Sequence, residues 1–176
     1  MFKDKRSGKI ALIAHCILNQ NSRASGLAER SSAITEILKF LVQNEIGVIQ
    51  MPCPELAYAG VLRPPQTKNQ YDNVTFRRRC RKIAEELVNQ VQEYEKCGIK
   101  LKLVLGVDGS PSCGVNETSK GKTCKSVLEH ERAKDSGILI EELRLALDER
   151  GISVPFYGIH YECLKDDVVK IKKYVE

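Results

Sequence analysis

Short apolar runs alternate with helical patterns along the chain. Four continuous runs rich in β-branched residues are typical of strands buried on both faces, and they cover residues 9–16, 48–53, 101–107 and 154–159. Apolar residues at helical spacing follow each run, over residues 34–42, 83–94, 139–147 and 164–175. This order predicts an α/β fold, a single-domain Rossmann-like three-layer sandwich over residues 1–176 with a mostly parallel sheet of about four or five strands.

Composition and charge exclude several classes of protein. Of the 176 residues, 42% are hydrophobic and 29% are charged, which is typical of a globular domain. The net charge of +5 permits an anionic ligand but falls short of a dedicated nucleic-acid binder. No apolar run approaches the roughly 20 residues of a membrane helix. Near the N-terminus the apolar block covers only residues 10–16 and is interrupted by His15, which does not fit a signal peptide. We therefore expect a cytoplasmic protein without membrane association. The oligomeric state stays open.

Seven cysteines, an odd number, fit a disulfide framework poorly. Four of them close or follow a predicted strand, at positions 16, 53, 113 and 163. Ligands of such folds bind beyond the carboxyl ends of the strands, so these residues could meet at one edge of the sheet. A plain core role stands beside this hypothesis, because free cysteine is often buried. We expect Cys80 and Cys97 to be structural and Cys124 to be an exposed loop thiol.

Three loops at predicted strand ends contain further chemistry. Residues 15–26 carry Cys16 and Arg23, and residues 51–65 carry Cys53 between two prolines, with Glu55 two positions later. Residues 106–114 are rich in small residues, which would let the backbone approach a ligand. A proline next to a ligand cysteine is also typical of iron–sulfur binding loops.

Together and in this order, the loops resemble the thiouracil desulfidase (TudS) family over residues 10–114. Cys16 and Arg23 match the family's first motif, although Ser22 stands where the family commonly has a second cysteine. The second motif is Pro52-Cys53-Pro54-Glu55, and Ser110-Pro111-Ser112-Cys113-Gly114 is the third. The usual glycine-rich segment after the third motif is replaced by a lysine-rich loop over residues 120–125, so we regard the chain as a divergent TudS-related branch.

The resemblance implies a 4Fe–4S cluster held by three cysteines, with one iron open to a small thiolated substrate. The substrate would be a thiolated pyrimidine base or nucleotide, which water would convert to a carbonyl compound with release of sulfide and no net redox change. The residues implied are Cys16, Cys53 and Cys113 as ligands, Glu55 as the base, Ser110 as a proton relay or hydrogen-bond donor, and Arg23, Arg63 and Ser112 as substrate contacts. Arg63 has a second interpretation, because it could simply cap its loop.

Two other functions remain open. If Cys163 approached the three cysteines, it would close the metal site and give a non-enzymatic iron–sulfur or zinc protein. A redox regulator would instead use Cys124 and Cys163 as reactive thiols. His15 precedes Cys16 in a predicted strand and should point to the opposite face, which argues against a ligand role. Arg77, Arg78 and Arg79 are interpreted as a solvated face, with phosphate binding as the less favoured alternative.

Overall fold

A parallel sheet lies at the centre of the computed structural model, which describes residues 3–124 and 127–175. The strand order is β2–β1–β3–β6. These strands span Gly47–Met51 (β2), Lys9–Ala14 (β1), Lys100–Val107 (β3) and Phe156–Ile159 (β6). Two further strands, β4 (Glu117–Cys124) and β5 (Val127–Lys134), form an antiparallel hairpin outside the sheet.

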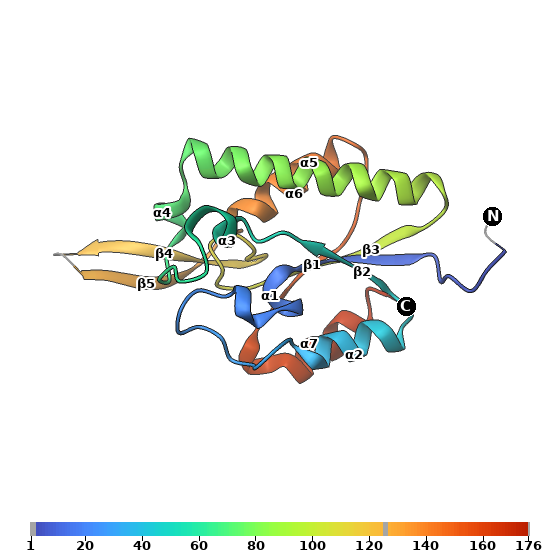
Figure 1. The fold of residues 1–176 in the computed structure, drawn as a ribbon, viewed down its shortest axis with the longest axis horizontal. Coiled ribbons are helices and arrows are strands. Elements are labelled where there is room, and N and C mark those ends of the chain that lie inside the picture. Colours follow the sequence, from blue (N-terminus) through green and yellow to red (C-terminus); the bar gives the residue numbers. More distant parts are fainter. Residues whose placement is uncertain (1–2, 125–126, 176) are drawn as a thin grey trace.

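Helices cover both faces of the sheet. The pair α5 (Val74–Lys96) and α6 (Ile138–Asp148) lies on one face, and α2 (Thr35–Gln43) and α7 (Leu164–Lys172) lie on the other (Figure 1). The predicted three-layer α/β sandwich is therefore confirmed, and its parallel sheet has four strands, within the expected four or five. The remaining short elements are α1 (His15–Leu18), η1 (Gln20–Ser22), α3 (Pro54–Ala59), α4 (Lys68–Tyr71) and η2 (Tyr161–Cys163).

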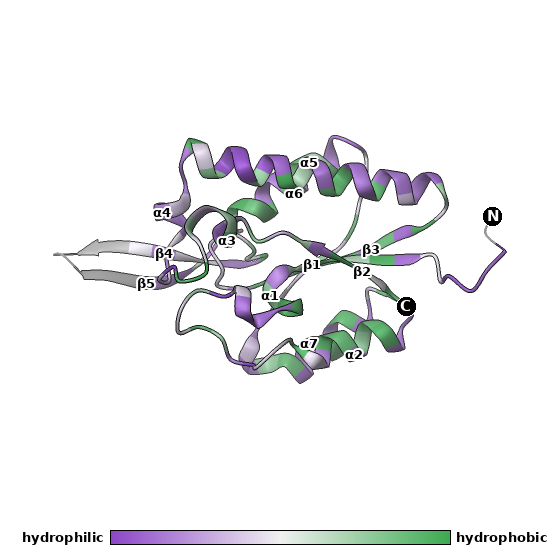
Figure 2. Ribbon diagram, in the orientation of Figure 1, coloured by the Kyte–Doolittle hydropathy of each residue, from purple (hydrophilic) through white to green (hydrophobic). Residues whose placement is uncertain are grey.

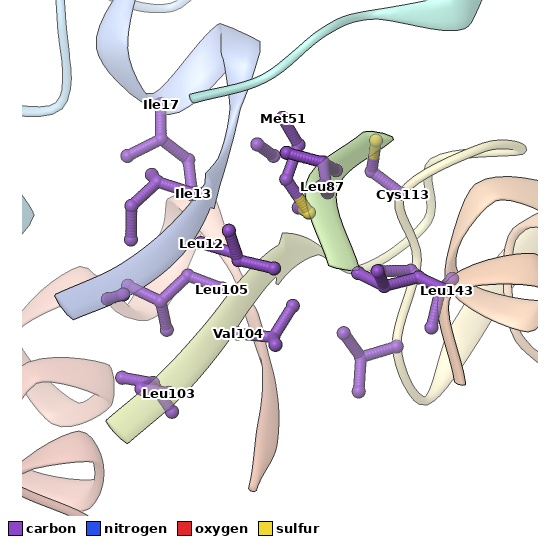
Figure 3. Packing of buried hydrophobic residues seen from close by; sticks show 14 of the residues in the cluster. Leu12, Ile13, Ile17, Met51, Leu87, Leu103, Val104, Leu105, Cys113 and Leu143 are labelled. Carbon is purple, nitrogen blue, oxygen red and sulfur yellow. The ribbon is translucent and has the colours of Figure 1, made fainter. Parts of the chain in front are cut away.

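The hydrophobic core explains why the strands are continuous apolar runs. Ala11, Leu12 and Ile13 of β1 are fully buried, as are Leu103 and Leu105 of β3, because helices exclude water from both faces. Figure 2 shows hydrophobic residues along the strands and many hydrophilic residues on α5, and Figure 3 shows the packing inside the core. Among the described residues, no helix combines the length and the apolar character needed to cross a membrane.

Three boundaries differ from those expected from sequence. The first strand ends at Ala14, and His15 and Cys16 begin α1 instead of continuing the strand. Helix α5 begins at Val74, because the Asn73 side chain caps it by accepting a hydrogen bond from the Phe76 amide. Its first turns are rich in arginine, so the apolar pattern of the sequence marked the helix only from residue 83 onwards. Helix α6 begins at Ile138, one residue before the predicted apolar pattern.

The predicted lysine-rich loop over residues 120–125 is also wrong for residues 120–124, which belong to β4 and pair with β5, while residue 125 lies outside the described residues. Its sequence has no sustained alternation of apolar and polar residues, which is the pattern that identifies a half-buried strand. The two strands pair with each other outside the sheet, so burial in the main core did not shape their sequence.

Strand order positions the loops. Strand β1 has β2 on one side and β3 on the other, and all three are parallel. Ala14 pairs with Met51 and Ile13 pairs with Leu105, so the three strands end close to one level. The chain leaves β1 towards β2 and later returns to β3 on the opposite side, which creates a topological switch point where ligands commonly bind.

Candidate metal centre and active site

Three cysteines line one cavity of about 490 Å³ at the carboxyl ends of the central strands. Cys16 lies in the first turn of α1, directly after β1. Cys53 caps α3, and its sulfur accepts a hydrogen bond from the Leu56 amide at 3.4 Å. Cys113 lies on the loop after β3, at the border of the core residues drawn in Figure 3. The structure therefore brings together three of the four cysteines that we expected to meet at one sheet edge.

The three thiols influence one another electrostatically. Burial raises the pKa of Cys53 to about 12, and the carboxylate of Glu55 and the neighbouring Cys16 add to this effect. Burial also raises the pKa of Cys113 well above its usual value, with further contributions from Cys53 and Cys16. The pKa of Cys16 is raised by burial, against the opposing charge of Arg23. Without a metal, the three groups are therefore neutral thiols at pH 7.

Glu55 lies beside these thiols and is nearly buried, with 9% of its surface exposed. Its Oε1 accepts a hydrogen bond from the Ser112 hydroxyl, and the Ser110 hydroxyl lies 3.5 Å from the same oxygen. Its Oε2 lies 3.5 Å from Nε of Arg63, which compensates the carboxylate charge in this enclosed place. Of the two serines, Ser112 makes the shorter contact with Glu55.

Arg63 connects the second loop to the first. It is 4% exposed, and it donates hydrogen bonds to the carbonyl oxygens of Gly60 at 3.0 Å and Ser22 at 2.8 Å. Its Nη2 also lies 3.7 Å from the sulfur of Cys53. Because contacts within the protein engage most of its five donors, this geometry favours the loop-capping interpretation of Arg63.

The loop that carries Cys113 is closed on itself by Ser110. The Ser110 Oγ accepts hydrogen bonds from the amides of Cys113 at 3.0 Å and Ser112 at 3.3 Å. The carbonyl of Ser112 then accepts the Leu139 amide at 2.9 Å at the start of α6. Ser110 therefore holds the loop in shape as well as facing Glu55.

Asp108 supports the same loop and was not predicted from sequence. One of its carboxylate oxygens accepts the amides of Val115 at 2.8 Å and Asn116 at 2.9 Å. The side chain is 8% exposed and lines the cavity. Its place immediately after a buried strand was an available signal, but the turn-rich sequence around it gave no reason to single it out.

The hairpin forms part of the cavity wall. Ser119 of β4 and Glu131 and Arg132 of β5 are among the lining residues. Its base is attached to the third loop, since the Gly109 amide donates to the Glu117 carbonyl at 2.9 Å and the Thr118 hydroxyl to the Ser110 carbonyl at 3.1 Å.

His15 and Arg23 line the cavity together with Cys16. The expectation that His15 faces away from Cys16 is wrong, because both residues lie in a helical turn, where strand alternation does not apply. The guanidinium of Arg23 stacks on Tyr161, 4.2 Å from the ring centroid. Its buried Nη1 has no hydrogen-bond partner among the described residues and lies 3.9 Å from Glu29.

The remaining cysteines lie elsewhere. Cys163 is exposed and is not among the described residues that line the cavity, so the structure gives no support to closure of the site by this thiol. Cys80 is fully buried in α5, as predicted, and Cys97 is exposed at the end of that helix. Cys124 ends β4, but its side chain lies outside the described residues.

The three consecutive arginines of α5 do not form a uniform solvated face. Arg78 and Arg79 are exposed, as expected. Arg77 is half-buried and pairs with Asp72 at 2.5 Å and Glu141 at 3.0 Å.

Comparisons with known proteins agree with this architecture. A family model described as "Putative 2-thiouracil desulfurase" matches residues 8–132. The uncharacterized protein MJ0003 of Methanocaldococcus jannaschii is 33% identical over 168 residues, which cover 96% of this chain and 95% of that protein. A solved structure of the 4Fe–4S-dependent thiouracil desulfidase TudS has the same fold, with a TM-score of 0.50 and 20% identity over 94% of this chain and 99% of that one. The extent of the family match and the identity to the archaeal relative show that the chain belongs to the putative 2-thiouracil desulfurase family.

Proposed function

We propose that this protein is an iron–sulfur-dependent desulfidase that replaces the sulfur of a small thiocarbonyl compound with oxygen. The substrate class is a thiolated pyrimidine base or nucleotide, and the reaction takes place in the cytoplasm. The observation that carries the proposal is the meeting of Cys16, Cys53 and Cys113 in one cavity with Glu55.

A single metal ion and a cluster set different requirements for the three thiols. Three thiolates bound to one zinc lie about 4 Å from one another, given a Zn–S distance of about 2.3 Å. Within residues 3–124 and 127–175, no three His, Cys, Asp or Glu side chains are arranged to hold one ion. A 4Fe–4S cluster sets a different requirement, because each thiolate binds a different iron.

Hydrogen-bond donors at the sulfurs also fit such a cluster. The Leu56 amide and the Arg63 guanidinium both approach the sulfur of Cys53. Such contacts stabilise thiolate ligands. When bound through three cysteines, the cluster would supply one iron with a free coordination position and affinity for the sulfur of a thiocarbonyl group.

Glu55 is proposed to activate water. Its carboxylate would take a proton as the water oxygen forms the new bond to the thiocarbonyl carbon, and the carbon–sulfur bond would then break. The products would be a carbonyl compound and sulfide, so that C=S and H₂O give C=O and H₂S with no change in oxidation state. The hydroxyls of Ser110 and Ser112 face the same carboxylate and would orient the water and pass protons.

Arg23 is proposed as the contact for a polar or anionic group of the substrate. The guanidinium lines the cavity. Its Nη1 has no hydrogen-bond partner among the described residues, so this nitrogen can donate to a ligand. Ser112 and Arg63 also border the cavity, but their bonds to Glu55 support a primary role in holding that carboxylate.

The first test measures iron and acid-labile sulfide on protein reconstituted without oxygen. About four of each per chain are expected, and a Cys16→Ser, Cys53→Ser, Cys113→Ser triple variant should retain neither. Sulfide release from thiouracil and from its nucleotides is then measured. A wild-type protein that binds no iron, or a fully loaded protein that releases no sulfide from either substrate class, would contradict the proposal.

The second test separates the chemistry from cluster binding. Glu55→Gln keeps the size of the side chain and should lower kcat by about 10²- to 10⁴-fold while the iron content stays unchanged. Glu36→Gln on α2 is the control, because that side chain is partly exposed and outside the cavity lining. Equal activity of the two variants would remove Glu55 from the proposed mechanism.

A further inference from the structure

Tyr161 lies behind Cys16, outside the segment that matches the family model. We propose that Tyr161 is a positioning residue of the iron–sulfur site, whose hydroxyl donates a hydrogen bond to the Cys16 sulfur and thereby raises the reduction potential of the bound cluster. The inference rests on the proposed function, since it requires a cluster held by Cys16.

The hydroxyl of Tyr161 is oriented by Gln20. The side-chain amide of Gln20 donates a hydrogen bond to the Tyr161 oxygen at 2.9 Å and another to the carbonyl oxygen of Cys16. Gln20 is 1% exposed, so these donors are withdrawn from water. Gln20 thus holds the phenolic oxygen beside Cys16, and because that oxygen accepts from Gln20, its own hydrogen is available to the Cys16 sulfur.

Arg23 fixes the ring of Tyr161. The guanidinium carbon lies 4.2 Å from the ring centroid, in a cation–π contact. The same guanidinium lines the cavity together with Cys16. A side chain held at its hydroxyl by Gln20 and at its ring face by Arg23 has little freedom to turn away from the sulfur.

The other two cysteines have their polar neighbours inside the matched segment. Cys53 is approached by Arg63, and Cys113 by Ser112. For Cys16 the side-chain donor comes from η2, which follows the last strand of the sheet. The C-terminal part of the chain thus completes a set in which each sulfur has a hydrogen-bonding neighbour.

The expected consequence is electrostatic. Reduction adds an electron to the cluster and increases the negative charge on its sulfur ligands. A hydrogen-bond donor stabilises that reduced state more than the oxidised one, and therefore raises the potential. Loss of the donor should shift the potential to a more negative value.

The test is a redox titration of the full chain, reconstituted without oxygen and followed by electron paramagnetic resonance. Tyr161→Phe keeps the ring and its contact with Arg23 but removes the hydroxyl, so its potential should be more negative than that of the wild type. Gln20→Leu should shift the potential in the same direction by a smaller amount, and it provides the measurement if Tyr161→Phe does not hold the cluster.

Tyr157→Phe is the matched control. This tyrosine lies on β6, and its hydroxyl donates to Asp167 at 2.7 Å, so the variant also loses one partly buried hydrogen bond. Its potential should equal that of the wild type. If wild type and Tyr161→Phe have equal potentials at full iron content, the inference is overturned and the proposed function is not. The same holds if Tyr157→Phe shifts the potential as much as Tyr161→Phe does. A wild-type protein without iron would overturn both the inference and the proposed function.

Discussion

The two arginines of the cavity differ in how their donors are used. Arg63 is almost fully buried, and its guanidinium contacts Glu55, Cys53 and two carbonyl groups. Arg23 stacks on an aromatic ring and keeps one buried nitrogen without a hydrogen-bond partner among the described residues. The first is therefore suited to hold the site together, and the second to meet a ligand.

The cysteine thiols differ in exposure and in pKa, and the rates of alkylation of the metal-free protein should reveal these differences. Iodoacetamide reacts with the thiolate, so the exposed Cys163 and Cys97 should be modified first at pH 8. Cys53 has a pKa of about 12, so its rate should be far lower and should rise about tenfold per pH unit towards that value. Peptide mass spectrometry measures each rate. A Cys53 rate that levels off near pH 9 would contradict the expected burial effect.

At the scale of elements, the loop after β3 is held by close backbone contacts. The carbonyl of Cys113 accepts the Val107 amide at 3.0 Å, so the loop folds back onto the strand that precedes it. A Cβ atom on Gly106 would lie 2.1 Å from that carbonyl oxygen. Only glycine allows the loop to approach the strand this closely. The approach fixes Cys113 at the carboxyl ends of the central strands.

Gly106→Ala should therefore separate the loop from β3. We expect a loss of about 1–3 kcal/mol in the free energy of unfolding, and lower iron content after reconstitution, because Cys113 moves. Gly47→Ala on β2 is the control, since its added Cβ would meet its nearest atoms at 3.4 Å. Urea unfolding and iron analysis measure both effects. Wild-type stability and iron content in Gly106→Ala would contradict this account of the loop.

At the scale of the whole molecule, the site combines segments that are distant in sequence. Cys16, Cys53 and Cys113 follow three neighbouring strands of one parallel sheet. Arg63 and the Ser25 amide, which donates to the Arg63 carbonyl at 3.0 Å, join the first two loops. A group bound by all three cysteines would join the third loop to them.

Reconstitution with iron and sulfide should therefore slow hydrogen exchange in the three loops together, over residues 15–23, 53–63 and 108–115. Exchange in α2 should not change, because that helix is outside the cavity lining. Cys16→Ser should remove the protection from all three loops, and not only from its own. Exchange followed by mass spectrometry measures this, and protection of the first loop alone would contradict a shared ligand.

The sequence by itself determined the strands of the parallel sheet and the cysteines that could act as ligands. Residues such as Leu12 and Leu103 belong to continuous apolar runs, and a strand buried on both faces leaves this signature locally. Four cysteines were identifiable because they close or follow such runs, and the resemblance to the TudS family selected three of them together with Glu55. A parallel sheet brings those loop ends to one edge, so their meeting could be predicted without coordinates.

Only the tertiary structure decided which other residues join the site. His15 shares the cavity with Cys16 because the strand ends one residue earlier, at Ala14. The β4–β5 hairpin forms part of the cavity wall, although its sequence lacks the periodicity of a buried strand. Tyr161 approaches Cys16 across 145 positions of the chain, whereas Cys163, two residues later, is exposed. Such contacts depend on strand order and on the direction of single side chains, which local periodicity does not encode.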